Sequence, residues 1–390
     1  MITNYINMPT FDLNEKFIIL TDCDATNHLC EYFDVNNIVF NFLPELLENI
    51  PLIDCIVDKK DKNKKILLIL TLENIEKLCH QTSRYNNFLN LIEDDSIKLI
   101  YYETADSLLK IYNMIYRDVR SGMATKTIDF LKNNKFVWWT DMIVGEWCKK
   151  TFKNVEFHEL QNPYFGSYNI QHFFHLKKEK EKTNTFFCLT KLHKDEDRIH
   201  RNWLIEKMQD KDYLKDAITH THQNIQEKKS IFLDLEKVYG PTWLASATWL
   251  DSVPVIPYYE KTYFELLTET LGAVDGDDTF FLTEKTLKPI AMGHPFIVLS
   301  TKHFLKNLRG LGFKTFGDFI DESYDECDNI ADRVEIISKN LERLDMAGSR
   351  KFHQDTWKIR EHNQEHLLYL HGQYKFGLWK AWNKFFNQII

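Results

Sequence analysis

Three consecutive residues of different chemistry, Thr283, Glu284 and Lys285, stand where the segment FFLTEKTLKPIAMGHPFIVLS passes from a loop into an expected helix. Thr283 is suited to cap that helix, and the exposed amides of a first helical turn form a ready site for an anion. Lys285 could neutralise a pyrophosphate beside them, while Glu284 could accept hydrogen bonds from ribose or sugar hydroxyls. A nucleotide sugar needs both kinds of group. The competing interpretation is an ordinary capped helix whose Glu284 and Lys285 face water.

A second group of candidates is basic and follows the expected strand Thr185 to Thr190, in the segment TFFCLTKLHKDEDRIHRNWLIEKM. The group consists of Lys191, His193, Lys194, Arg198 and Arg201. Ligands of open α/β sheets bind just past the carboxyl ends of strands, which makes Lys191, Arg198 and Arg201 candidates for contacting phosphates. Ion pairs along a surface helix, such as Asp197 with Arg201, would explain any one of these residues equally well.

Two aspartates, Asp22 and Asp24, directly follow an apolar run in FIILTDCDATN. This pattern resembles the nucleophile motif of haloacid-dehalogenase-type phosphatases, in which magnesium bridges the carboxylates, and the D-x-D metal motif of one glycosyltransferase architecture. The phosphatase also needs a later strand that ends in paired aspartates, but those at 275–278 follow no apolar run, and the D-x-D comes too early for a sugar-nucleotide sheet. The remaining hypothesis makes Asp22 or Asp24 the general base that deprotonates an acceptor hydroxyl, with Asp141 and Glu146 as competitors.

The cysteines and histidines predict no metal site. Seven cysteines are scattered without a CxxC pair, which fits a reducing compartment. The histidine pairs of QHFFH and HTH have ligand-like spacing but no carboxylate or cysteine partner. A formal charge of -8 gives no overall attraction to a polyanion, and no run of about 18 apolar residues or leader segment occurs. We therefore expect no essential metal, no membrane span and a cytoplasmic location.

The elements that must position these residues form two series. At 390 residues, of which 44% are hydrophobic, the chain is long enough for two domains. Strands alternate with helices in each series, which indicates parallel sheets with both faces covered. The expected strands are Phe17 to Leu20, Lys65 to Leu70, Ile97 to Tyr102, Phe136 to Trp139, Thr185 to Thr190, Tyr263 to Thr268 and Phe296 to Leu299. The expected helices are Thr71 to Cys79, Ala105 to Ile115, Arg198 to Met208, one that opens near Glu284, and His303 to Leu308.

The lysine-rich stretch LKKEKEKTN, at Leu176 to Asn184, is the expected linker between the two series. It predicts an N-terminal domain over 1–176 and a C-terminal domain over 184–350. Residues 351–390 contain no proline, have spaced aromatic rings, and are expected to form terminal helices with one apolar face.

The segment from residue 262 to 325 resembles the donor-binding region of α1,3-fucosyltransferase-like enzymes of the GT-B architecture, and is more similar still to glycosyltransferases of large phages and other DNA viruses. An extended run ends in T-E-T, T-E-K-T with a Lys-Pro follows, and G-x-P-F precedes the next strand. Here these are Thr268 to Thr270, Thr283 to Thr286 with Lys288 and Pro289, and Gly293 to Phe296. The resemblance extends through LRGLGFKTFGDFIDESYD and covers about a third of the chain.

This resemblance implies two Rossmann-like domains that face a central cleft, with C-terminal helices crossing back. It implies a C-terminal site for a nucleotide-sugar donor built from Glu269, Glu284 and Lys285, and an acceptor in the N-terminal domain. A glycan is the expected acceptor. The viral relatives make a hydroxymethylated base of DNA an alternative, and would place the enzyme in the host cytoplasm.

Overall fold

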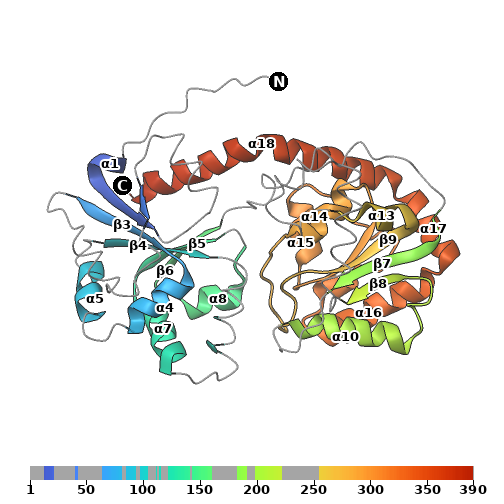
Figure 1. The fold of residues 1–390 in the computed structure, drawn as a ribbon, viewed down its shortest axis with the longest axis horizontal. Helices are drawn as coiled ribbons and strands as arrows, with labels where there is room; N and C mark the ends of the chain where they lie inside the picture. The colour runs from blue at the N-terminus through green and yellow to red at the C-terminus, as the bar shows by residue number, and fades with distance from the viewer. Residues whose placement is uncertain are drawn as a thin grey trace. The chain divides into compact units, whose positions relative to one another are not determined.

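The computed structural model of the chain describes residues 13–21, 40–42, 64–80, 85–93, 97–103, 111, 114–115, 122–140, 143–159, 182–190, 198–221 and 254–389. The chain divides into two compact units (Figure 1). Unit 1 is Met1–Pro163 together with Lys375–Ile390, and unit 2 is Tyr164–Tyr374. The linker expected at 176–184 lies largely outside the described residues, so the domain boundaries drawn from the sequence stay a prediction.

Unit 1 is built on a parallel sheet with the strand order β2-β1-β3-β4-β5-β6. The strands are β1 (Phe17–Thr21), β2 (Phe40–Phe42), β3 (Lys65–Leu70), β4 (Ile97–Glu103), β5 (Phe136–Thr140) and β6 (Val155–Glu159). Every residue of β5 is buried, as a strand covered on both faces requires. Because β2 and β3 lie on opposite sides of β1, the strand order reverses at β1.

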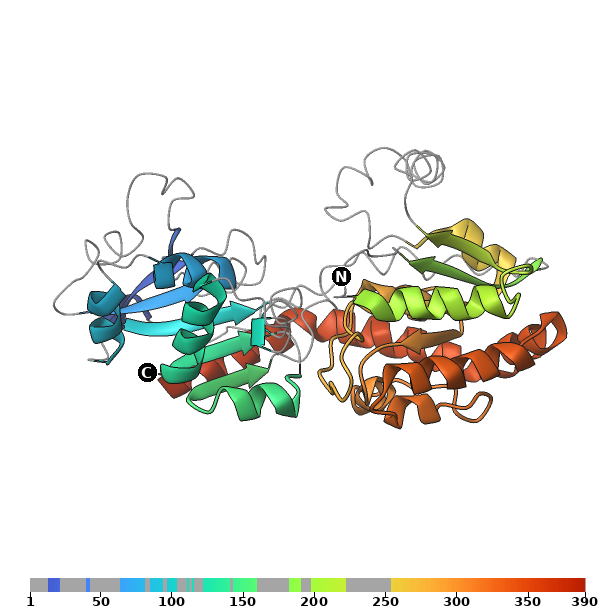
Figure 2. The ribbon, with the colours of Figure 1, turned by 90° about the horizontal axis from the view of Figure 1, so that it is seen from below.

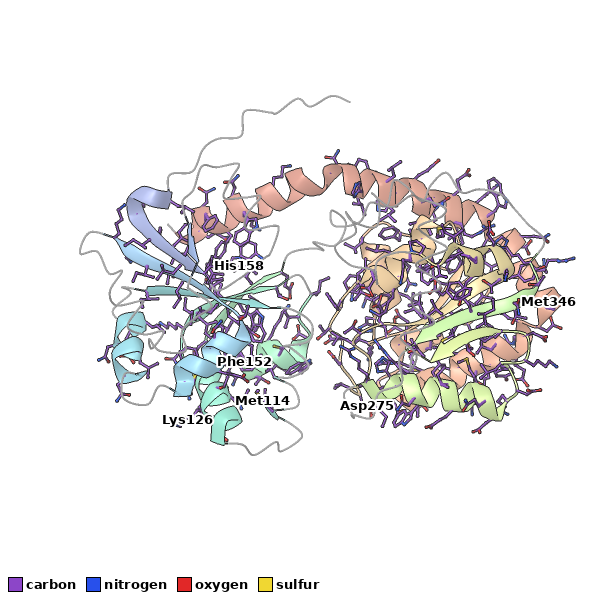
Figure 3. The ribbon with its side chains drawn as sticks, in the orientation of Figure 1. Met114, Lys126, Phe152, His158, Asp275 and Met346 are labelled. Atoms are coloured by element: carbon purple, nitrogen blue, oxygen red, sulfur yellow. The ribbon has the colours of Figure 1, made fainter. Side chains whose placement is uncertain are left out.

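Short helices cover the sheet of unit 1. They are α1 (Leu13–Lys16), α4 (Leu72–His80), α5 (Tyr85–Glu93), α7 (Gly122–Asn133) and α8 (Glu146–Thr151). Aromatic side chains fill the core between sheet and helices. The ring centroid of Trp138 lies 5.4 Å from that of Phe152, labelled in Figure 3, and 4.8 Å from that of Tyr101. The expected helix Ala105 to Ile115 falls mostly outside the described residues.

Unit 2 is built on a second parallel sheet, with the order β10-β9-β7-β8. The strands are β7 (Asn184–Thr190), β8 (Ile218–Thr221), β9 (Thr262–Thr268) and β10 (Phe296–Leu299). All seven residues of β9 are buried. As in unit 1, the second strand in sequence pairs on one side of the first and the third strand pairs on the other. The predicted α/β class with two Rossmann-like domains is therefore confirmed.

Helices line both faces of the second sheet. They are α10 (Ile199–Asp210), α13 (Ile256–Lys261), α14 (Glu284–Ala291), α15 (Phe304–Gly310), α16 (Ile330–Arg343) and α17 (Met346–Asp355), with a 3-10 turn η4 (Ser323–Glu326). Figure 1 shows α14 on one side of the strands and α10 with α16 on the other. Seen from below in Figure 2, α10 and α16 lie side by side, and an ion pair of 2.7 Å between Lys207 and Glu335 joins them.

The last helix, α18 (Trp357–Ile389), contributes to both units. Its first part packs in unit 2, where the Asn363 side chain bonds the backbone of Lys314. Its last part packs in unit 1, where the rings of Trp382 and Trp139 stack at 3.6 Å and Phe385 contacts His158, labelled in Figure 3. No helix in the described part of the chain is both long and apolar enough to cross a membrane.

Candidate functional site

The point where the strand order of unit 2 reverses lies between β7 and β9. Both strands end there in a buried threonine, and the hydroxyl oxygens of Thr190 and Thr268 are 3.1 Å apart. Open α/β sheets bind their ligands outside the carboxyl ends of the two strands that flank such a reversal. The residues that follow Thr190 and Thr268 along the chain are therefore the first candidates for a ligand site.

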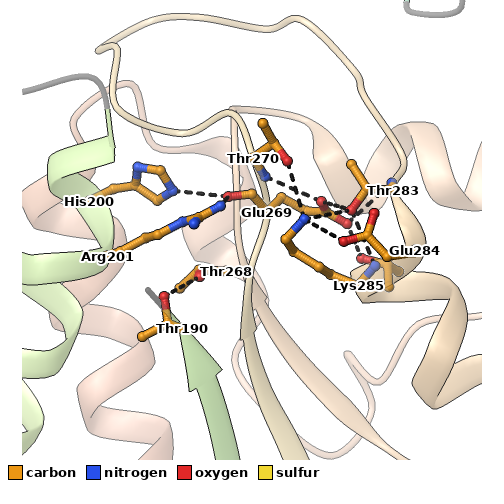
Figure 4. Close-up of polar contacts among 10 residues, drawn as sticks. Thr190, His200, Arg201, Thr268, Glu269, Thr270, Thr283, Glu284 and Lys285 are labelled. Carbon is orange, nitrogen blue, oxygen red and sulfur yellow. Dashed lines mark hydrogen bonds and ion pairs between the residues drawn. The ribbon is translucent and has the colours of Figure 1, made fainter. Parts of the chain in front are cut away.

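Glu269 follows β9 and is completely buried. Its Oε2 accepts a hydrogen bond of 2.5 Å from the Thr283 hydroxyl, and its Oε1 accepts one of 2.6 Å from the Thr286 hydroxyl. The backbone amides of Thr283 and Thr270 add longer bonds of 3.4 and 3.3 Å (Figure 4). The Glu269 carboxylate thus points into the protein, and its hydrogen bonds join the start of α14 to the end of β9.

Lys285 and Glu284 form the partly exposed side of the site. Lys285 Nζ lies 2.7 Å from Glu284 Oε1 and 3.3 Å from the hydroxyl of Thr270, with side-chain exposures of 27% for Lys285 and 18% for Glu284. Burial acts to raise the pKa of Glu284, but the positive charges of Lys285 and Lys288 outweigh it and hold that pKa below its usual value. One cation and one carboxylate therefore stand together beside the strand reversal (Figure 4).

Thr283 caps α14 as the sequence predicted. Its hydroxyl oxygen accepts a hydrogen bond of 3.2 Å from the backbone amide of Lys285. This bond uses one of the first-turn amides that the sequence analysis had expected to stay open for an anion. The Lys285 side chain adds a positive charge at the same turn, 3.3 Å from the Thr270 hydroxyl.

Two buried basic residues of α10 meet the same end of β9. Arg201 Nη2 donates a hydrogen bond of 3.1 Å to the carbonyl oxygen of Glu269, and His200 Nε2 lies 3.1 Å from the same oxygen. The loop after β9 can approach this closely because residue 272 is glycine. A Cβ on Gly272 would lie 3.1 Å from the His200 ring, and its φ of +152° disfavours other residues.

The structure brings together five of the predicted site residues: Arg201, Glu269, Thr283, Glu284 and Lys285. Arg198 is half-buried at the start of α10. Asp22, Asp24 and Lys191, together with the competing base Asp141, lie outside the described residues. Glu146, the other competitor, begins α8 in unit 1. The ligand contacts expected of these residues stay predictions, except that the buried Glu269 carboxylate is already fully hydrogen-bonded within the protein.

Three threonines that complete this arrangement were not among the predicted site residues: Thr190, and the motif residues Thr270 and Thr286. Thr286 could have been found, because it lies three residues after the cap Thr283 and so shares one face of α14. Thr190 carries a weaker signal, since its place at the strand reversal depends on the order of the sheet. Within the described ranges, no group of three His, Cys, Asp or Glu side chains is placed to hold a metal ion.

A second buried carboxylate, Glu265, lies within β9, four residues before Glu269. It accepts a hydrogen bond of 2.7 Å from the Tyr259 hydroxyl. Burial raises the pKa of Glu265 to about 7, and the nearby charge of Glu269 adds to this, while Lys288 and the Tyr259 bond act against it. Glu265 is thus a neutral or partly charged group at neutral pH, enclosed below the site.

Known proteins resemble the chain only distantly. No known protein family and no curated protein matches the sequence. Among solved structures, a UDP-glucosyltransferase from Polygonum tinctorium capable of glucosylating indoxyl, in complex with 3,4-dichloroaniline, is 9% identical, with 95% of this chain and 99% of that chain covered and a TM-score of 0.34.

Two further structures match over similar lengths. A glycosyltransferase from Rickettsia africae ESF-5 is 13% identical over 94% of this chain and 99% of its own, with a TM-score of 0.37. MnaA of S. aureus with UDP is 12% identical, with 93% of this chain and 97% of that chain covered and a TM-score of 0.33.

Proposed function

We propose that the chain is a glycosyltransferase that moves a sugar from a nucleotide-sugar donor to an acceptor hydroxyl, and that unit 2 holds the donor. The observation that carries this proposal is the Lys285 ammonium, 2.7 Å from the Glu284 carboxylate, beside the strand reversal of unit 2. A lysine at this position can form ion pairs with a diphosphate, and a carboxylate can accept hydrogen bonds from ribose hydroxyls.

In the proposed reaction, the bond between the anomeric carbon of the sugar and the diphosphate oxygen breaks while the acceptor oxygen bonds to that carbon. The nucleoside diphosphate leaves with the electron pair, and Lys285 stabilises its developing charge. The acceptor hydroxyl gives its proton to a base, for which we propose Asp22 or Asp24. Those two residues directly follow β1, the strand at which the order of the other sheet reverses.

The acceptor we propose is a glycan, with a hydroxymethylated base of DNA as the second candidate. Both supply a hydroxyl to the same chemistry, so the described residues favour neither. Arg198 and Arg201, with Lys191, are proposed to assist Lys285 at the diphosphate, and no step of the proposal calls on a metal ion.

Thermal unfolding with UDP, GDP, ADP, CDP and TDP tests the donor site. A nucleotide at one hundred times its dissociation constant stabilises the folded protein by about 2.7 kcal/mol. We expect one nucleotide to raise Tm, and the rise to disappear in Glu284→Ala and Lys285→Ala. Lys302→Ala is the matched control, because Lys302 forms a comparable 2.6 Å ion pair with Asp328 elsewhere in unit 2.

A second measurement separates enzyme from binding protein. Turnover requires free nucleoside diphosphate to appear when a nucleotide sugar and an acceptor are supplied together. Binding without release would leave a nucleotide-binding protein. A Tm shift by magnesium with a phosphate mimic, lost in Asp22→Asn, would instead support the phosphatase.

A further inference from the structure

Glu269 has no capacity left for a ligand. A carboxylate accepts about four hydrogen bonds, two on each oxygen. Oε1 receives the Thr286 hydroxyl and the Thr283 amide, and Oε2 receives the Thr283 hydroxyl and the Thr270 amide. The residue is also completely buried. Sugar or ribose hydroxyls therefore have no free acceptor on Glu269.

The same carboxylate fixes the rotation of α14 about its own axis. Thr283 and Thr286 are three residues apart, so they share one face of the helix, and each grips a different oxygen of Glu269. With one hydrogen bond α14 could still rotate about its axis, whereas the two hydrogen bonds from Thr283 and Thr286 fix that rotation. Lys285 projects from a different face, where it reaches Glu284 and Thr270.

Glu269 also connects this helix with α10 on the far side of the strand reversal. Its carbonyl oxygen receives the Arg201 guanidinium, while its side chain holds the turn that carries Lys285. Glu269 therefore contacts both Arg201, through its main chain, and the turn that carries Lys285, through its side chain.

We infer that Glu269 and Thr286 are positioning residues of the proposed donor site, which hold the first turn of α14 so that the Lys285 ammonium stands at the carboxyl end of β9. This inference rests on the proposed function for its ligand, but the placement of Lys285 can be observed without any ligand. Thr286 is buried and touches no ligand in this scheme.

The test compares Thr286→Val with Thr286→Ser. Valine keeps the shape of threonine and lacks the hydroxyl, whereas serine keeps the hydroxyl. Thr356→Val is the matched control, because Thr356 is equally buried and bonds the Phe352 carbonyl at 2.7 Å, away from the site. Reductive 13C-methylation labels the lysine amines, and Lys285→Arg identifies the Lys285 signal.

We expect the Lys285 signal to move in Thr286→Val, to return in Thr286→Ser and to stay in place in Thr356→Val. The dissociation constant for whichever of UDP, GDP, ADP, CDP and TDP binds the wild type should rise about tenfold in Thr286→Val, because Lys285 is no longer held in its position before binding. Serine should restore it to about its original value.

An unmoved Lys285 signal in Thr286→Val would overturn the inference, whatever the nucleotides do. A signal that moves in a protein to which none of the five nucleotides binds would support the positioning role and overturn the proposed function. If Thr286→Val does not fold, Glu269→Gln takes its place, and a Lys285 signal that stays unmoved there overturns the inference in the same way.

Discussion

Lys285 and Glu284 are proposed to contact the donor, and their ion pair should contribute little to the stability of the fold. Their ion pair is partly exposed, and such pairs contribute about 0–1 kcal/mol to stability. The Lys285 ammonium also lies 3.3 Å from the Thr270 hydroxyl. The charge is therefore held in place before a ligand arrives, which is the arrangement that stabilises a leaving group most effectively.

Replacing Lys285 with alanine should lower turnover of a nucleotide sugar by about 100-fold or more, the usual loss when a preorganised group at a developing charge is removed. Tm without ligand should change little, because the pair is exposed. Steady-state kinetics measure the turnover, and thermal unfolding measures Tm. Lys302→Ala should leave turnover unchanged, and equal losses in the two variants would contradict the role of Lys285.

Glu265 predicts a pH dependence of stability. Its pKa is raised from 4.5 to about 7, mainly by burial, so between these values the folded chain holds a proton that the unfolded chain has released. Its contribution to stability is fully present below pH 4.5 and is lost as the pH rises through 7. The free energy of unfolding of Glu265→Gln, relative to that of wild type, should therefore rise by about 1–3 kcal/mol between pH 4.5 and pH 8.

Urea unfolding of both proteins across this pH range measures the gain. The difference between variant and wild type is the useful quantity, because His294 and His353 act in the opposite direction. Burial lowers the pKa of both histidines, so their contribution to stability is lost as the pH falls below about 6.5. If the difference in unfolding free energy between Glu265→Gln and wild type did not change with pH, the proposed titration of Glu265 would be wrong.

Among the elements, the sequence predicted the buried strands well and the edge strands poorly. β3, β5 and β10 are almost entirely apolar, because both faces of a parallel sheet are covered, and β9 is fully buried although it contains Glu265. β2, β6 and β8 lie at sheet edges and were missed, whereas the edge strand β10, all of whose residues are buried, was predicted. No residue of β6 is fully buried, so its sequence VEFHE carries charges that mask a strand.

The candidate site divides in the same way. The helix start at Thr283 and the neighbouring Glu284 and Lys285 could be predicted, because capping and charge are local properties. The inward orientation of Glu269 could not, since it depends on Thr283 and Thr286 across a loop. The strand order that places Thr190 beside Thr268 is likewise a long-range property of the fold.

The chain after α14 packs closely against α18, at Gly293. Gly293 has a φ of +58°, and a Cβ there would lie 2.7 Å from the side chain of Gln364 on α18. Gly293→Ala should therefore lower the free energy of unfolding by about 1–3 kcal/mol, from backbone strain and the contact together. Thermal unfolding measures the loss. Adding Gln364→Ala should relieve the contact and leave the strain, so full recovery would contradict the backbone part of this explanation.

The last helix, α18, contributes buried side chains to both units. Leu367 is buried in the part that belongs to unit 2, and Trp382 is buried in the part that belongs to unit 1. Trp382 stacks on Trp139 of β5 at 3.6 Å, and Phe385 meets the same Trp139 ring edge to face. The final turns of the chain thus complete the core of the unit with which the chain begins.

Trp382→Ala should remove about 3–5 kcal/mol of stability from unit 1, the usual cost of emptying a large buried aromatic site. Hydrogen exchange resolves where the loss falls, because amides exchange through local as well as global opening. Protection should fall in β5 and β6 and persist in β9 and β10. Leu367→Ala, in the same helix, should give the reverse pattern. If either variant lowered protection equally in both sheets, the two units would unfold as one cooperative body, and the division of α18 between two separately stable cores would be wrong.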